Sequence, residues 1–162
     1  MQNSNITINK AAESDIDTAI SIALEAWAPI YNGYRLELGE ELFDGIFSKW
    51  QESKSKSVSD GLRSRRGYVA KDDGKVVGFI YYLYDPKTKI GTIGENAVNQ
   101  AYRGQGIGGM LYQYVFKCLE AEGAEHVKVT TGGDDEHAPA RRAYEKAGFE
   151  VYLPSVVYYK KL

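Results

Sequence analysis

The segment best suited to chemistry is a glycine-rich loop between Val98 and Gly109. Four glycines occupy the six positions from 104 to 109, and a strongly helical pattern follows. Glycines let consecutive backbone N–H groups face one concavity without a Cβ in the way, and the helix adds the positive end of its dipole. Such a cradle suits an anion, best a phosphate or pyrophosphate. A glycine-rich turn without a ligand is the alternative, but it would lose conformational entropy for no gain.

The loop fits two common nucleotide motifs poorly. Gly104, Gly106 and Gly109 match G-x-G-x-x-G, but residues 99–103 separate the first glycine from the preceding strand. Only 53 of the 162 residues follow Gly109, too few for the second half of a dinucleotide-binding domain. A P-loop is excluded because no Gly-Lys-Ser/Thr follows the glycines.

Two motifs in the chain carry a family resemblance. The pattern Arg103-x-x-Gly106-x-Gly108 resembles the pyrophosphate-binding motif of the GNAT superfamily of acetyl-CoA-dependent N-acetyltransferases. A later pattern resembles a second motif of that family, which usually begins with Asn: His137-x-x-Ala140-x-x-x-Tyr144-Glu145-Lys146-x-Gly148-Phe149. The resemblance is strong over residues 68–150 and weak over 1–66, where this family varies and often builds the acceptor site.

The resemblance implies a fold and a cofactor. The expected α/β fold has a mixed, mostly antiparallel sheet flanked by helices and splayed between its fourth and fifth strands, 92–98 and 127–131. The pantetheine of acetyl-CoA would lie in that gap, and a backbone N–H near Ala97 or Val98 would polarise the thioester oxygen. Arg103 would either contact phosphate or brace the loop. The implied cofactor-binding residues are Asn96, Ala97, Val98, Arg103, Gly104, Gln105, Gly106, Ile107, Gly108, Gly109, His137, Ala140 and Tyr144.

Acetyl transfer also needs a base for the attacking amine, and Glu95 is the candidate. It is the only ionisable residue in the strand 92–98. The period of two places it on one face with Ile93 and Ala97. It would act directly or through water. The alternatives are a solvent-facing glutamate and a glutamate paired with a nearby basic side chain.

Tyr144 is the candidate general acid for the leaving thiolate. The reference pKa is about 10 for a phenol and about 8.5 for a thiol, so the phenol helps mainly by hydrogen bonding to the developing charge. The alternative is a buried tyrosine that packs against Phe149. His137 departs from the usual Asn of the motif and is expected to donate one hydrogen bond to the cofactor; otherwise it is a surface histidine beside Asp134. Cys118 is expected in the core, and no metal site is expected.

The hydrophobic periodicity predicts one α/β domain whose elements could position these residues. Ser14 is the expected N-cap of the first helix. A serine-rich segment, 52–64, looks most like a loop. We expect strands near 6–8, 67–70, 76–84, 92–98, 126–131 and 150–159, and helices near 14–27, 42–50, 106–122 and 139–147.

Composition excludes several classes of protein. The chain carries 20 basic and 22 acidic residues, a poor balance for binding nucleic acid or an anionic membrane. One cysteine forms no internal disulfide, residues 1–5 do not resemble a secretory signal, and the longest apolar run, 76–84, is far below the roughly 20 residues that span a bilayer. We expect a single cytoplasmic N-acetyltransferase domain, 1–162, with an acceptor-side region, 1–66, and an acetyl-CoA-binding core, 67–150.

The predicted activity is transfer of an acetyl group from acetyl-CoA to a primary amine by direct attack in a ternary complex. The acceptor would be a small-molecule or protein amine. Eight acidic and three basic residues in positions 1–50 favour a cationic acceptor, or are solvated helix faces. Aromatic side chains could line its pocket or simply pack: Trp27, Tyr31, Tyr34 and Phe43. A basic cluster would instead favour an anionic acceptor or a cofactor phosphate: Arg63, Arg65 and Arg66.

Two further expectations stay open at this point. A non-catalytic module that senses acyl-CoA, or binds another phosphate ligand, would carry the same glycine cradle. Residues 156–160 could pair across a homodimer, by analogy with similar proteins.

Overall fold

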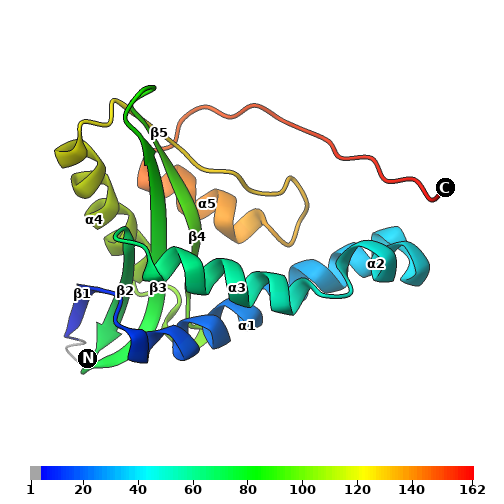
Figure 1. The fold of residues 1–162 in the computed structure, drawn as a ribbon, viewed down its shortest axis with the longest axis horizontal. Helices are drawn as coiled ribbons and strands as arrows, with labels where there is room; N and C mark the ends of the chain where they lie inside the picture. Colours follow the sequence, from blue (N-terminus) through cyan, green and yellow to red (C-terminus); the bar gives the residue numbers. More distant parts are fainter. Residues whose placement is uncertain (1–4) are drawn as a thin grey trace.

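A computed structural model of the chain, which describes residues 5–162, contains one five-stranded sheet in the order β1-β2-β3-β4-β5 (Figure 1). Neighbouring strands are antiparallel except β4 and β5, which are parallel. The strands are β1 (Ile6–Lys10), β2 (Gly67–Asp72), β3 (Lys75–Asp85), β4 (Ile90–Val98) and β5 (His126–Lys128). The expectation that no secretory signal opens the chain falls mostly on residues 1–4, which lie outside the described residues.

Within the described residues the α-helices pack on the two faces of the sheet, except the short helix 40–47, which packs against the first helix away from the sheet (Figure 1). They are α1 (Ile16–Leu38), α2 (Glu40–Phe47), α3 (Trp50–Arg63), α4 (Ile107–Glu122) and α5 (Ala138–Ala147). Alternate residues of β3 separate two cores, because successive strand side chains point to opposite faces. Phe79 packs with α1 and α3, whereas Ile80 packs with α4. The expected α/β fold with a mixed sheet between helices is therefore confirmed.

Strand β4 pairs fully on one edge only. It pairs with β3 from Ile90 to Val98, but with β5 only from Ile90 to Thr92. The chain leaves strand geometry after Lys128, so β5 is shorter than the predicted 126–131. From residue 93 onward the β5-side edge of β4 is open. The predicted splay between these two strands is confirmed.

A β-bulge interrupts β4 at Gly94 and Glu95. Ile80 pairs with Asn96 and Tyr82 pairs with Ile93, so two residues of β4 face the single residue Tyr81 of β3. An extra residue in one strand reverses the alternation of faces beyond it. Ile93 consequently lies in the α4 core, and Ala97 packs against the α1 and α3 core. The prediction that Ile93, Glu95 and Ala97 share one face is wrong for Ile93.

The helices within residues 1–66 differ from their predicted bounds. The segment 52–64, expected as a loop, forms most of α3, because Val58 and Leu62 share one helix face and both are buried. The predicted helix 42–50 ends at Phe47, and Trp50 begins α3.

The start of α1 also departs from the expectation. Ser14 is not its N-cap but lies within a 3-10 turn, Glu13–Asp15. Asp15, the actual N-cap, accepts the Ala12 N–H at 3.0 Å and pairs with Lys71 at 2.8 Å. The carboxylate makes no capping hydrogen bond to α1, and its two partners connect the 3-10 turn to β2 instead.

The end of the chain contains no strand, against the prediction for 150–159. Residues 149–162, which we call the tail, run extended with most of their apolar side chains exposed. The far end of the tail rests on α2, where Tyr159 packs edge-on against Phe47 and Lys161 pairs with Glu41 (Figure 1). Alternation of apolar residues indicates a strand only where a neighbour supplies the ladder, and β5 ends before it could do so.

We predict that Gly94→Ala destabilises the protein. The Cβ of alanine would overlap the ring carbons of Tyr81, which fills the space between Gly94 and Gly61. Overpacking of this kind costs about 1–3 kcal/mol, so the free energy of unfolding in denaturant should fall by that amount. The matched control is Gly45→Ala, an exposed helical position with open space, which should gain up to about 1 kcal/mol. Equal stability of the two variants would contradict the tight fit of Tyr81.

Candidate functional site

The open edge of β4 presents backbone groups to the gap beside β5. The Asn99 N–H donates to the Val77 carbonyl oxygen at 2.8 Å. Antiparallel pairs alternate, so Ala97 directs its N–H toward β3, while Asn96 and Val98 direct theirs into the gap. Of Ala97 and Val98, the two residues predicted to polarise the thioester, only Val98 directs its N–H into the gap, and its role stays a prediction. The Arg103 Nε also donates to the Val98 carbonyl oxygen at 3.3 Å, which is the bracing role considered for this arginine.

The glycine loop meets this edge at the start of α4. Gly104 and Gly106 have φ angles of 78° and 83°, in the left-handed region that favours glycine. The first backbone bond into the helix runs from the Met110 N–H to the Gly106 carbonyl oxygen at 3.0 Å. The N–H groups of residues 107–109 therefore have no intrahelical acceptor. A Cβ at Gly104, Gly106 or Gly109 would meet nothing within 4 Å, so the cradle is open to a ligand.

Tyr144 lies across the gap in a small polar cluster. The Tyr112 hydroxyl donates to Asn96 Oδ1 at 2.7 Å, and the rings of Tyr112 and Tyr144 lie 5.7 Å apart. Burial raises the pKa of Tyr144, while Asn96 and Tyr112 act in the opposite direction. The phenol therefore stays protonated at neutral pH and can donate a hydrogen bond. It also packs edge-on against Phe149, so it takes the packing role as well.

Asn96 connects this cluster to the bulge. Its Nδ2 donates to the Gly94 carbonyl oxygen at 3.2 Å, while its Oδ1 accepts from Tyr112. One side chain thus holds both the irregular backbone of β4 and the tyrosines on the α4 side.

Glu95 lies on the opposite face of β4, toward α3. Its side chain is 18% exposed and forms an ion pair with Lys54, so it matches the paired alternative and is not solvent-facing. The Lys54 ammonium also lies 4.4 Å from the centre of the Trp27 ring. The second carboxylate oxygen, Oε2, is buried without a hydrogen-bond partner. A buried acceptor of this kind is costly unless a donor reaches it, so it is ready to take a hydrogen bond from a ligand.

A cluster of aromatic side chains, which we call the aromatic wall, lies beside this ion pair and contains Tyr31, Tyr34 and Trp50. Tyr31 stacks on Trp50 with ring centres 4.3 Å apart. Burial and the nearby Glu95 charge raise the pKa of Tyr31. Burial, followed by the charge of Asp134, raises the pKa of Tyr34 to about 12. Of the predicted aromatic residues, Phe43 is buried beneath Arg35 and belongs to the packing of α2.

An acidic cleft of about 350 Å³ adjoins the aromatic wall. It lies between the second half of α1 and the loop before α5. Its lining residues are Gly33, Tyr34, Leu36, Glu37, Asp134, Asp135 and Glu136. The carboxylates give this side of the site a negative potential that favours cations.

His137 and Ala140 lie at the start of α5, as the second motif predicts. The His137 Nδ1 lies 2.7 Å from Asp134 Oδ1, and its backbone N–H donates to the same oxygen at 3.0 Å. Burial would raise the pKa of Asp134, but these contacts hold it below the usual value. The imidazole is 13% exposed, so it is not a surface histidine, and it has only Nε2 left for a ligand.

Several other candidates have structural partners. Arg63 pairs with Glu13, and Arg66 pairs with Glu122 at 2.5 Å. The remaining arginine of that cluster, Arg65, lies 3.5 Å from the same Glu122. The basic cluster therefore faces carboxylates. Cys118 packs against the α4 core, as predicted.

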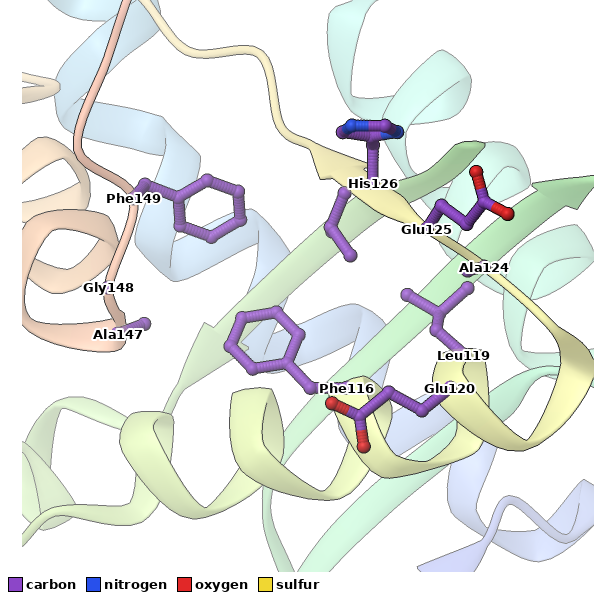
Figure 2. Close-up of a pocket in the computed structure, with 10 residues that line it drawn as sticks. Phe116, Leu119, Glu120, Ala124, Glu125, His126, Ala147, Gly148 and Phe149 are labelled. Atoms are coloured by element: carbon purple, nitrogen blue, oxygen red, sulfur yellow. The ribbon is translucent and has the colours of Figure 1, made fainter. Parts of the chain in front are cut away.

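A second cavity, of about 480 Å³, lies between α4, β5 and the end of α5. It is outside the gap between β4 and β5. Phe116 and Phe149 point into it from opposite sides (Figure 2). None of the predicted site residues lines it. Its lining beside the short β5 mixes apolar side chains with Glu120, Glu125 and His126.

The residue that the sequence analysis missed is Lys54. Its segment was interpreted as a loop, so nothing indicated that it faces β4. The spacing Lys54–Val58–Leu62 was the available signal, because residues four apart share one helix face. No cluster of three or more potential metal ligands occurs within residues 5–162, and no helix in that range is long and apolar enough to cross a membrane.

Comparisons with known proteins agree with this fold. The model of the acetyltransferase (GNAT) family matches residues 24–149. None of the curated proteins compared with the chain matches it significantly. Among the similar solved structures is a PaiA N-acetyltransferase from Thermoplasma acidophilum with coenzyme A, with a TM-score of 0.69, 21% sequence identity and 91% of each chain covered. The aminoglycoside N-acetyltransferase AAC(6')-Iy with CoA has a TM-score of 0.67 and 14% identity, and the match covers 99% of this chain and 98% of that one. The aminoglycoside acetyltransferase meta-AAC0020 from a soil metagenomic sample, with sisomicin, has a TM-score of 0.58 and 21% identity, and the match covers 97% of this chain and 96% of that one.

We predict that the Asp134–His137 contact stabilises the fold in a pH-dependent way. A carboxylate whose pKa is lowered by folding contributes stability above its unfolded value of 3.8 and loses it as the pH falls through the folded value. Asp134→Asn should therefore lower the free energy of unfolding at pH 7, and the difference from the parent should shrink below about pH 4. Denaturant titrations over this pH range measure it, and a difference that stays constant down to pH 2 would contradict the assignment.

Proposed function

The chain belongs to the acetyltransferase (GNAT) family, and we propose that it transfers an acetyl group from acetyl-CoA to a primary amine in a ternary complex. The observation that carries the proposal is the open edge of β4 beside the glycine-rich start of α4. An edge that offers backbone hydrogen bonds and a helix N-terminus that offers N–H groups together suit an extended chain ending in a pyrophosphate.

Residues on both sides of the gap would hold the donor. The N–H groups of residues 107–109 and the positive φ of Gly106 support pyrophosphate binding. Asn96 and Val98 would pair with pantetheine in place of a neighbouring strand. His137 Nε2 and the Ala140 position on α5 would close the far side. Acetyl-CoA supplies the thioester that is the electrophile.

The two faces of β4 would divide the proton transfers. Glu95 on the α3 side would take a proton from the attacking ammonium, directly or through water, and its unpartnered Oε2 supports that role. Tyr144 on the α5 side would donate a hydrogen bond to the leaving thiolate. The Val98 N–H, aimed into the gap between them, would stabilise negative charge on the thioester oxygen. The amine adds to one face of the carbonyl and the thiolate leaves from the resulting tetrahedral carbon, so a base and an acid on different faces of β4 would serve the two groups separately.

The acceptor in this proposal is a small, cationic primary amine. The acidic cleft and the aromatic wall support a cation, because carboxylates and ring faces both attract positive charge. Two of the similar structures are named as aminoglycoside acetyltransferases. The proposal includes no nucleic-acid or membrane partner, since the overall charge is close to neutral. It also includes a cytoplasmic location, because a single cysteine suits a reducing compartment.

A homodimer belongs to the same proposal. The tail exposes Val156 and Val157, and pairing across two copies would bury these side chains.

We predict that Gly108→Val weakens acetyl-CoA binding at least tenfold, about 1.4 kcal/mol, because its side chain would stand between the ligand and the backbone N–H groups. The nearest atom to a Cβ there is 3.9 Å away, so the fold should tolerate the change. Isothermal titration calorimetry with acetyl-CoA, CoA and NAD measures it. The control is Gly45→Val, an exposed glycine in α2. Absence of affinity for either CoA form in the parent protein would overturn the proposal.

We predict that Tyr144→Phe lowers kcat by about tenfold to a hundredfold with little change in acetyl-CoA affinity, as expected for loss of a donor to the leaving group. Thiol release over a panel of amines measures kcat, and Tyr152→Phe, in the exposed tail, is the matched control. Turnover with any amine distinguishes an enzyme from a module that only senses acyl-CoA. Unchanged kcat in Tyr144→Phe would remove the tyrosine from the acid role.

A further inference from the structure

The Lys54 ammonium lies against Glu95, the residue proposed as the base for the attacking amine. The Lys54 side chain is 12% exposed, and its ammonium pairs with Glu95 and lies on the Trp27 ring. A primary ammonium on a flexible aliphatic stem is thus held against the carboxylate proposed as the base. Lys56, two residues further along the same helix, is 77% exposed and pairs with Asp60 instead.

We propose that Lys54 is an internal acetyl acceptor, so that the protein acetylates itself at this residue. The inference rests on the proposed function, because it uses the same donor and the same base. Glu95 and Val98 are three residues apart on β4, so the carboxylate and the gap lie within about 10 Å along the strand. The four-carbon stem of lysine is flexible, so the amine could turn from the carboxylate toward the gap.

The transfer balances without a further reactant. Glu95 accepts one proton from the Lys54 ammonium, the free amine forms a bond to the thioester carbonyl carbon, and the nitrogen then loses a second proton, which balances the one taken up by the CoA sulfur. The C–S bond breaks, and its electron pair leaves with the CoA sulfur, which takes up a proton beside Tyr144. The products are an Nε-acetyl-lysine at position 54, free CoA and one released proton.

Acetylation would change the acceptor side of the site. An acetylated Lys54 carries no charge, so the ion pair with Glu95 and the cation–π contact with Trp27 are both lost. The carboxylate is then free of its internal cation. Self-acetylation would therefore free the Glu95 carboxylate for an external ammonium, which otherwise has to compete with Lys54 for it.

The test is incubation of the full chain with acetyl-CoA and no acceptor, followed by intact mass and peptide mapping. We expect one acetyl group at Lys54, at a rate independent of protein concentration. Reaction with acetyl-CoA in solution would favour exposed amines, so Lys56 and the variant Lys56→Arg are the matched controls. Acetylation at Lys56 in preference to Lys54 would overturn the inference.

Two variants complete the test. Lys54→Arg keeps the charge and should lose the modification, and Glu95→Gln should slow it by about a hundredfold if the carboxylate is the base. Thermal unfolding of both variants verifies that they fold. If the protein acetylates added amines while Lys54 stays unmodified, the inference fails and the proposed function stands. If no form of CoA binds, the proposed function itself fails.

Discussion

The one-sided pairing of β4 is the constraint on which the rest of the site depends. A strand interior to a sheet normally has every backbone N–H and C=O paired, and β4 has this only toward β3. On its other edge β5 pairs with just three residues and then departs. The remaining groups must find partners elsewhere, and Arg103 already takes one of them at Val98. The helix with the open N-terminus, α4, is the next α-helix after β4, and the glycine loop joins the two. The two halves of the proposed donor site are thus consecutive in the chain.

The bulge in β4 gives that strand two chemically different faces. Regular alternation would place Ile93, Glu95 and Ala97 together, with one apolar neighbour on each side of the carboxylate. The extra residue instead keeps Ile93 in the α4 core and turns Glu95 toward α3. Gly94 is required there because Tyr81 occupies the space of a side chain. Asn96 then bridges the bulge and reaches the tyrosines on the other face. A local irregularity of one residue thereby separates the candidate base from the candidate acid.

Features that depend on residues close together in the sequence were predicted well, whereas features that depend on residues far apart in the sequence were not. The glycine loop, the helix 106–122 and the start of α5 follow from residues within one or two turns of each other, and their positions were predicted closely. The splay was implied by the family resemblance and is confirmed. The ion pair of Glu95 with Lys54 joins residues 41 positions apart, and no local pattern indicates it. The many serines in α3 suggested a loop, but burial of Val58 and Leu62 stabilises a helix there. The tail shows the opposite error, since its alternating apolar residues suggest a strand although no neighbour supplies a ladder. The roles of the site residues stay predictions.

Both tryptophans of the chain, Trp27 and Trp50, lie on the side of the site proposed for the acceptor. Trp27 lies beneath the Lys54 ammonium, and Trp50 stacks on Tyr31. The donor side, from the glycine loop to Tyr144, contains none. Intrinsic emission excited at the indole band therefore reports on one half of the site alone. A ligand that fills only the cradle at α4 leaves both indoles in their surroundings, whereas one that displaces the ammonium from Trp27 changes the charge against an indole face. Tryptophan fluorescence should therefore distinguish a ligand bound only at the glycine loop from a ligand that displaces the Lys54 ammonium.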